Sequence, residues 1–135
     1  MMPLLFLAAA SADLDALDQA VTHCERASVN PMFAGEAARR SAFLLEAYHE
    51  QEVIVADRLA LADQRRTLRE NSDMKVAERK QADKQLALQE AAIEDRQKAL
   101  NDKRMLEGIR EDAMDSMRHY FLLNCPAGGG QEKAR

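Results

Sequence analysis

A stretch of 72 residues, from Glu36 to Glu107, contains neither glycine nor proline. Gly and Pro most often interrupt helices, whereas this stretch is rich in Ala, Leu, Glu, Lys, Gln and Arg, which are strong helix formers. The stretch is therefore predicted to be helical. As one unbroken helix it would be roughly 110 Å long, so a chain of this size must either form a rod or fold back on itself.

Composition predicts a thin core with solvated outer faces. Hydrophobic residues make up 47% of the chain, but Ala supplies 24 of the 135 residues, Trp is absent and aromatics are only 4%. Because Ala buries little apolar area, the helices are expected to pack closely around a narrow interior. The net charge of −4 argues against general affinity for nucleic acids. Residues 65–84 are the exception, with 7 basic and 4 acidic side chains.

The first twelve residues, Met1 to Ala12, have features of an export signal. Residues 4–9 form an apolar run, and Ala10-Ser11-Ala12 then supplies the small-x-small pattern that signal peptidase recognises. No Lys or Arg precedes the run, and the segment is shorter than usual signal peptides. We expect a short or truncated signal peptide and an exported, periplasmic protein. The alternative is a hydrophobic N-terminal helix turn in a cytoplasmic protein.

Residues 13–125 are predicted to form one helical domain, with helices at about 13–28, 33–70 and 74–122. Ser28-Val29-Asn30-Pro31 is expected to end the first helix, because the residue before proline is pushed out of the α region. Asn71-Ser72-Asp73 is the only turn chemistry within the long run, since these residues favour helix caps. The alternative is one continuous helix through this point. Residues 126–135, with three glycines in a row, are expected to be a flexible tail.

The two cysteines favour a chain that folds back on itself. An antiparallel hairpin with its turn near Ser72 would place residue 24 opposite residue 120, close to Cys125. A straight rod would hold Cys24 and Cys125 far beyond disulfide reach. The expected fold is all-α: a long antiparallel coiled-coil helical hairpin, with a short N-terminal helix packed at its base and a Cys24–Cys125 disulfide. Free thiols, or a zinc site with His23 and His119, are the alternatives.

Heptad spacing predicts the seams of this coiled coil. On the third helix a strict seven-residue repeat consists of Ala92, Ala99, Leu106, Ala113 and Tyr120. A second repeat flanks it, one residue further along, and consists of Leu86, Ile93 and Leu100. On the second helix the repeat is Ala47, Ile54, Leu61 and Leu68. No Phe or Tyr occurs between Tyr48 and Tyr120, so the densest packing is expected near the two ends of the chain.

One stretch of the second helix is too apolar for a two-helix hairpin to bury. Residues 53–62 are apolar at eight of ten positions, around more than one face. A homodimer with a four-helix arrangement is the simplest solution. The expected dimer contacts are Val53, Ile54, Val55, Leu59 and Leu61.

Basic side chains are expected to gather around the predicted turn. They are Arg65, Arg66, Arg69, Lys75, Arg79, Lys80 and Lys84. The functional interpretation is weak contact with an anionic surface, and the alternative is a solvated, salt-bridged end of the coiled coil. No aromatic residue lies nearby to stack on bases, so sequence-specific nucleic-acid binding is not expected.

Catalytic motifs are absent from the sequence, and neither a catalytic residue nor a cofactor is predicted. Glu46 and His49 have the Glu-x-x-His spacing of di-iron bundles, but a second such motif is missing, so a metal-dependent enzyme would require dimerisation. The preferred hypothesis is an exported interaction protein, acting as adaptor, scaffold or holdase on a protein partner. The second is a cytoplasmic coiled-coil adaptor of a secretion-type assembly, similar in architecture alone to the small helical hairpins that accompany bacterial secretion motors.

Overall fold

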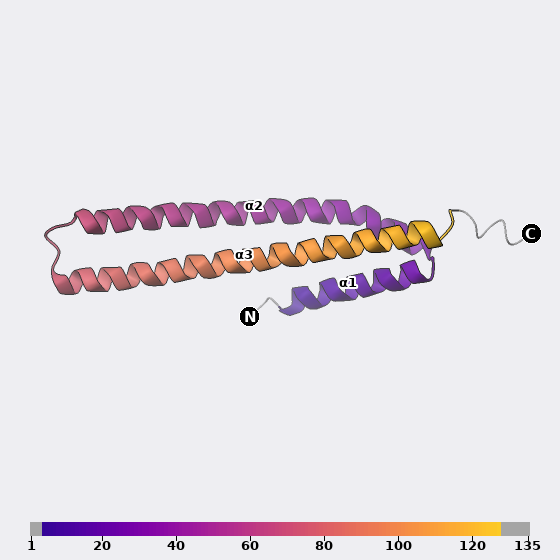
Figure 1. Cartoon of the computed structure of the whole chain (residues 1–135), viewed down its shortest axis with the longest axis horizontal. Coiled ribbons are helices and arrows are strands. Elements are labelled where there is room, and N and C mark those ends of the chain that lie inside the picture. The colour runs from indigo at the N-terminus through magenta and orange to yellow at the C-terminus, as the bar shows by residue number, and fades with distance from the viewer. Residues whose placement is uncertain (1–3, 128–135) are drawn as a thin grey trace, which may run out of the picture. The chain divides into compact units, whose positions relative to one another are not determined.

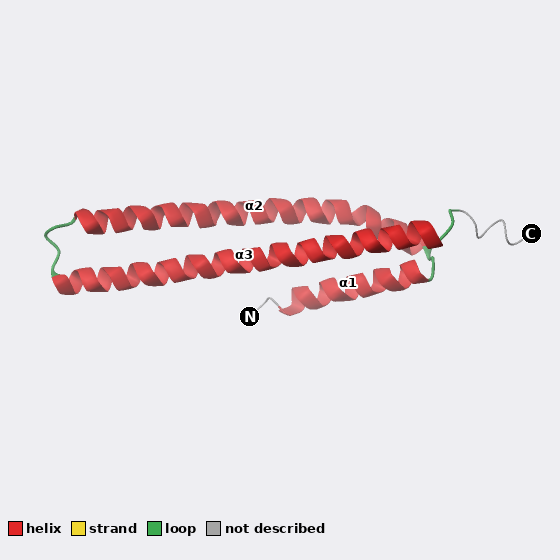
Figure 2. Ribbon diagram, viewed as in Figure 1, coloured by secondary structure: helices red, strands yellow, loops and turns green. Residues whose placement is uncertain are grey.

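The computed structural model describes residues 4–127, with side chains from Asp13 onward. The described residues form three helices and no strands: α1 (Leu4–Thr22), α2 (Arg26–Glu70) and α3 (Val76–Asn124) (Figures 1 and 2). The all-α class and the hairpin of two long helices are thereby confirmed. The chain divides into two compact units, Met1–Ser41 with Gly108–Arg135, and Ala42–Glu107.

The first unit is a three-helix core. Its buried residues come from all three helices: Leu17, Ala20 and Val21 from α1, Val29 from α2, and Met114, Phe121 and, just after α3, Cys125. Phe33 packs against this core, whereas Tyr120 is exposed. Apolar area in this unit is therefore buried between three helices and not between two.

The second unit is an antiparallel pair formed by parts of α2 and α3, and its seam is narrow. Each helix contributes about one buried apolar residue per heptad, where coiled coils normally bury two. The buried residues are Ala47, Ile54, Leu61 and Leu68 on α2 and Leu86, Ile93 and Leu100 on α3. Intervening layers are polar: Gln51 and Gln97 exchange amide hydrogen bonds, and Arg65 pairs with Glu90 at 2.5 Å.

The heptad expected as the main seam of α3 was the wrong one of two neighbouring repeats. Leu86, Ile93 and Leu100 are buried, whereas Ala92, Ala99, Leu106 and Tyr120 of the strict repeat are exposed and Ala113 is half-buried. The two repeats lie one residue apart, or about 100° around the helix. Burying leucine and isoleucine removes more apolar area from water than burying alanine, so α3 turns that face inward.

The first helix break lies at His23–Glu25, before the position predicted from Pro31. Cys24 adopts the left-handed conformation, with φ of 55°. The Glu25 N–H donates to the Ala20 carbonyl and the Cys24 N–H donates to the Val21 carbonyl, at 2.9 and 3.1 Å. This is a Schellman motif with cysteine at the position that glycine usually occupies. The sequence did not predict this end of α1, because glycine, the residue that usually marks such an end, is replaced by cysteine.

Pro31 lies inside α2, so the expectation that it separates two helices was wrong. It sits in the second turn, where it removes one intrahelical hydrogen bond and costs about 3 kcal/mol in a free helix. Val29 before it is fully buried, and Met32 and Phe33 after it pack on the core of the first unit. These anchors on both sides keep the chain helical through the proline.

The predicted break at Asn71-Ser72-Asp73 is confirmed. The Asn71 side chain accepts a hydrogen bond from the Asp73 N–H at 3.2 Å, which forms a local turn. The start of α3 comes two residues later than expected, and its N-terminus is capped by Glu78, whose carboxylate accepts from the Lys75 N–H at 3.4 Å.

Gly35 in α2 and Gly108 in α3 offer a direct test of helix stability. A Cβ built at either position meets nothing within 4 Å, and glycine within a helix is less favourable than alanine by roughly 0.5–1 kcal/mol. Gly108→Ala is therefore expected to raise the free energy of unfolding by about that amount, measured by urea denaturation. Ala38→Gly, at an exposed position of α2, is the opposite control. A loss of stability in Gly108→Ala would contradict the open surroundings of this residue.

Candidate interaction surface

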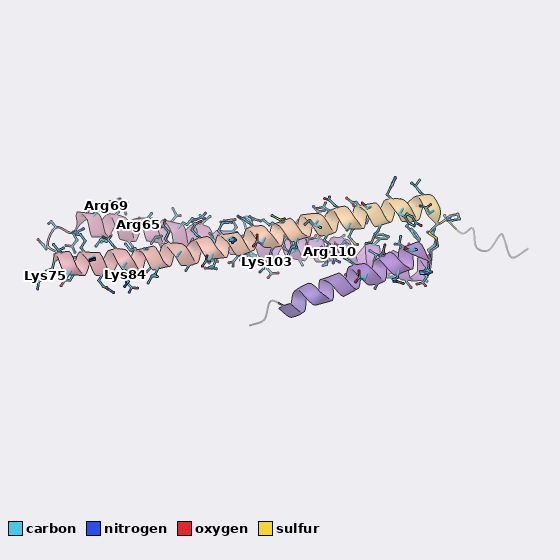
Figure 3. All side chains as sticks on the ribbon, turned by 60° about the horizontal axis from the view of Figure 1, so that its bottom comes forward. Arg65, Arg69, Lys75, Lys84, Lys103 and Arg110 are labelled. Carbon is cyan, nitrogen blue, oxygen red and sulfur yellow. A yellow bond between two sulfur atoms is a disulfide. The ribbon has the colours of Figure 1, made fainter. Side chains whose placement is uncertain are left out.

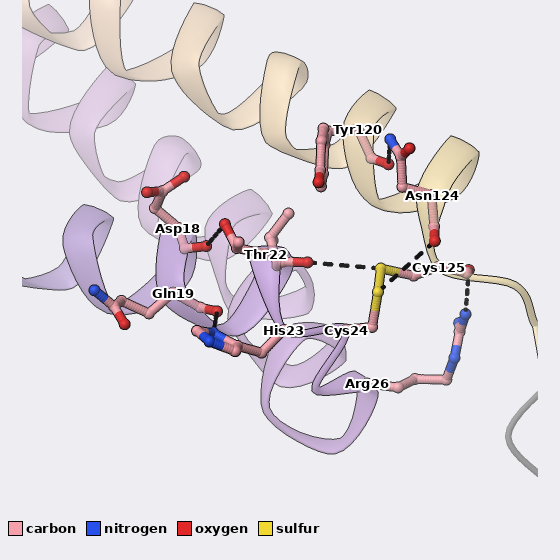
Figure 4. The surroundings of a disulfide bond; sticks show 10 residues. Asp18, Gln19, Thr22, His23, Cys24, Arg26, Tyr120, Asn124 and Cys125 are labelled. Atoms are coloured by element: carbon pink, nitrogen blue, oxygen red, sulfur yellow. Dashed lines mark hydrogen bonds between the residues drawn. A yellow bond between two sulfur atoms is a disulfide. The ribbon is translucent and has the colours of Figure 1, made fainter.

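Cys24 and Cys125 form the predicted disulfide, with a Cα–Cα distance of 5.4 Å (Figure 4). The Arg26 guanidinium donates to the Cys125 carbonyl oxygen at 3.0 Å and covers the Phe121 ring at 4.8 Å, which fixes the chain on both sides of the bridge. Since both sulfurs are bonded to each other, they cannot serve the alternative zinc site. The His23 ring is also engaged, through Nδ1 and the Gln19 carbonyl oxygen at 2.8 Å.

A buried arginine joins the three helices of the first unit. Arg110, on α3, is 9% exposed and donates to Asp13 of α1 at 2.7 Å and to Glu36 of α2 at 3.1 Å. Arg39 also binds Glu36, at 2.7 Å. Sequence reasoning missed this cluster, because Arg110 looks like one more charge on a charged helix.

The buried ion pairs shift the pKa values of their members. Burial by itself would raise the pKa of Glu36, but hydrogen bonds from Arg39 and Arg110, together with their charges, lower it to about 2. The hydrogen bond to Glu36 raises the pKa of Arg110 against the opposing effect of burial. Glu36 and Arg110 therefore stay charged at neutral pH and hold the helices together electrostatically.

The predicted basic residues do gather at the α2–α3 turn, but three of the seven make contacts within the chain (Figure 3). Arg65 pairs with Glu90, Arg66 pairs with Asp63 at 2.9 Å, and Arg79 donates to the Leu68 and Asn71 carbonyl oxygens. The remaining four side chains are exposed: Arg69, Lys75, Lys80 and Lys84. The positive surface is therefore smaller than the residue count suggested.

Two of the five predicted dimer contacts are buried within the chain. Ile54 is 0% exposed and Leu61 is 6% exposed, because both lie in the seam with α3. Val53, Val55 and Leu59 are exposed as a dimer contact would require. Val53 lies two residues before Val55, and thus about 200° around the helix, on another face. Only Val55 and Leu59 share a surface.

That surface continues along α2 as a row of exposed side chains, here named the α2 stripe: Leu45, Tyr48, Glu52, Val55 and Leu59. The residues follow one another at alternating steps of three and four, an average of 3.5. Tyr48 and Leu59 are 60% and 64% exposed, and they line a shallow hollow together with Val55. This spacing is the repeat of a coiled-coil seam, so the stripe has the form of a seam without a partner helix.

Glu52 is the one charged residue of the α2 stripe, and it is not isolated. It accepts a hydrogen bond from the Tyr48 hydroxyl one turn earlier, and this bond and the carboxylate charge raise the pKa of Tyr48. The pair gives the apolar stripe a polar centre, which can distinguish between partners that bury it well and those that do not.

The structure also places the residues considered for metal chemistry. Glu46 and His49 are exposed on α2, and no three His, Cys, Asp or Glu side chains are placed to hold a metal ion within residues 13–127. Within the described residues, no helix combines the length and the hydrophobicity that a membrane span requires.

Comparison with known proteins adds no functional information. No protein-family model matches the chain, and no similar curated protein or solved structure was found.

Proposed function

We propose that this chain is a non-enzymatic, exported coiled-coil interaction protein, an adaptor or scaffold that binds a helical partner along the α2 stripe. The observation that carries the proposal is the exposure of Leu45, Tyr48, Val55 and Leu59 at coiled-coil spacing. The second unit buries only one narrow seam of its own, so a further helix along α2 would add the apolar burial that this unit lacks.

The disulfide supports the exported form of this proposal over the cytoplasmic adaptor. Structural disulfides persist in oxidising compartments and are rare in the cytosol. The Cys24–Cys125 bond joins residues 101 apart, and Cys125 is buried in the core of the first unit. Export would remove residues 1–12 and leave Asp13, the partner of Arg110, at the new N-terminus.

The mass of the protein from its native host tests export. The expected mass lacks residues 1–12 and two hydrogens, for cleavage after Ala12 and for the disulfide. An intact N-terminus with two thiols that react with iodoacetamide would overturn the exported form and favour the cytoplasmic adaptor.

Photo-crosslinking in the native host tests the α2 stripe. A photoreactive residue at Tyr48 or Leu59 is expected to give a discrete adduct, because both lie on the stripe. The matched control is Val53, which is exposed on the same helix but faces elsewhere. Adducts that follow the 3.5-residue repeat support the proposal, whatever the partner. Equal adducts at all three positions, or none at any, would contradict it.

A further inference from the structure

We propose that the partner on the α2 stripe is the α2 stripe of a second copy of this chain, packed antiparallel about a two-fold axis between Glu52 and Val55. This inference rests on the proposed function, since it identifies the helix that covers the stripe. The resulting dimer places two α2 helices side by side, with each α3 on its own α2.

The repeat of the α2 stripe determines what kind of surface covers it. Steps of three and four residues keep these side chains on one side of the helix, and a second helix with the same repeat matches them along the whole stripe. The stripe of a second copy has the same repeat, so its side chains interleave without any insertion. In the antiparallel arrangement Tyr48 packs on Leu59 of the second copy, and symmetry repeats this contact at the other end.

Glu52 determines the direction of pairing. In a parallel dimer the two copies of Glu52 would meet in the same layer, and like charges at a seam are destabilising. In the antiparallel register Glu52 instead lies opposite Val55 of the second copy. Each Glu52 keeps its hydrogen bond from Tyr48 at the edge of that layer.

Charge complementarity favours the same register. Arg58 flanks the α2 stripe one residue before Leu59, and in the antiparallel dimer it comes beside Glu52 of the second copy. Arg58 is exposed and bonded to Glu94 at 3.2 Å in a solvated ion pair, so its guanidinium has donors left for a second carboxylate. The two-fold axis makes this cross-pair twice.

The area involved suits a reversible dimer. Burying the four large apolar side chains of the stripe and the adjacent Leu44, each more than 45% exposed, removes on the order of 100 Å² apiece. The two copies together would bury about 1,000 Å², which is at the lower limit for a specific interface. Association is therefore expected at micromolar concentrations rather than as an obligate dimer.

Sedimentation equilibrium of the oxidised full chain tests self-association. At about 100 µM the wild type is expected to approach twice its monomer mass, and Leu59→Glu is expected to weaken dimerisation at least about tenfold. Val53→Glu is the matched control, because it adds the same charge to another exposed position of the same helix. It is expected to dimerise as the wild type does, and thermal melts of both variants check that they fold.

Spin labels test the direction of pairing. The native cysteines are both in the disulfide, so Glu46→Cys and Ala56→Cys each carry a single free thiol. Antiparallel packing predicts an interlabel distance at residue 46 longer than that at residue 56 by roughly 15 Å. Equal distances would overturn the antiparallel dimer. A wild type that stays monomeric would overturn self-pairing, while periodic crosslinks to another protein would leave the proposed function standing.

Discussion

Replacing Cys24 by Ser is expected to lower the free energy of unfolding by about 4–5 kcal/mol under oxidising conditions. The disulfide closes a loop between residues 101 apart, and long loops lose the most entropy in the unfolded chain when they are closed. Because small proteins have a marginal total free energy of unfolding, this contribution is a large share of it. Urea denaturation with and without dithiothreitol measures it, and the variant should differ little from the reduced wild type.

Two further variants separate the bridge from the strain at Cys24. Cys125→Ser breaks the same bond and keeps the left-handed residue, so it should lose about as much as Cys24→Ser. Cys24→Gly also breaks the bond but relieves a positive φ of 55°, which costs a side-chain-bearing residue roughly 1 kcal/mol. Cys24→Gly should therefore be the most stable of the three. An equal loss under oxidising and reducing conditions would contradict a stabilising role for the bridge.

Replacing Arg110 by Met is expected to cost about 3 kcal/mol. The change keeps an unbranched apolar stem but removes the guanidinium that bonds to Asp13 and Glu36. The Glu36 side chain is only 15% exposed. Without Arg110, its buried carboxylate loses one of the positive charges that offset the cost of its removal from water. Arg40→Met is the matched control. Its ion pair with Glu111 is largely exposed, so the loss should stay below about 1 kcal/mol.

The pH dependence gives Arg110→Met a readout that lost packing would not produce. The pKa of Glu36 is about 2 in the folded chain and near 4.5 without its partners, so its contribution is fully present above pH 4.5. That contribution, about 3 kcal/mol, is lost as the pH falls from 4.5 toward 2. In Arg110→Met the folded pKa rises, and the acid-induced loss should shrink. If the free energy of unfolding falls between pH 4.5 and 2 as much in Arg110→Met as in the wild type, Arg110 does not hold Glu36 ionised.

The sequence contained enough information for the hairpin, because a long run without Gly or Pro permits few folds. The turn at Asn71 and the pairing of Cys24 with Cys125 followed from ordinary cap chemistry and from chain geometry. The break at Cys24 did not, because a cysteine in the left-handed conformation is set by tertiary contacts. The burial of Val29 similarly overrides the local preference of Pro31 to end a helix.

The candidate surface could be predicted only in part. An excess of apolar residues in 53–62 was visible, and the heptad of α2 correctly placed Ile54 and Leu61 in the seam with α3. Counting the same two residues as dimer contacts ignored that heptad, whereas Val55 and Leu59 do lie outside the seam. The role of Arg110 depends on two carboxylates brought from distant parts of the chain, and no local pattern encodes such a meeting.

The Cys24–Cys125 bond also determines how the chain carries mechanical force. A pull applied to the segments before Cys24 and after Cys125 runs through the two sulfurs and bypasses the residues between them. The second unit, with its narrow seam, lies entirely inside the bypassed loop and bears no load while the bond is intact. Reduction would transfer the full tension to α2 and α3, whose paired helices separate from one end. Under tension, the oxidised chain therefore keeps the α2 stripe folded and exposed, whereas the reduced chain does not.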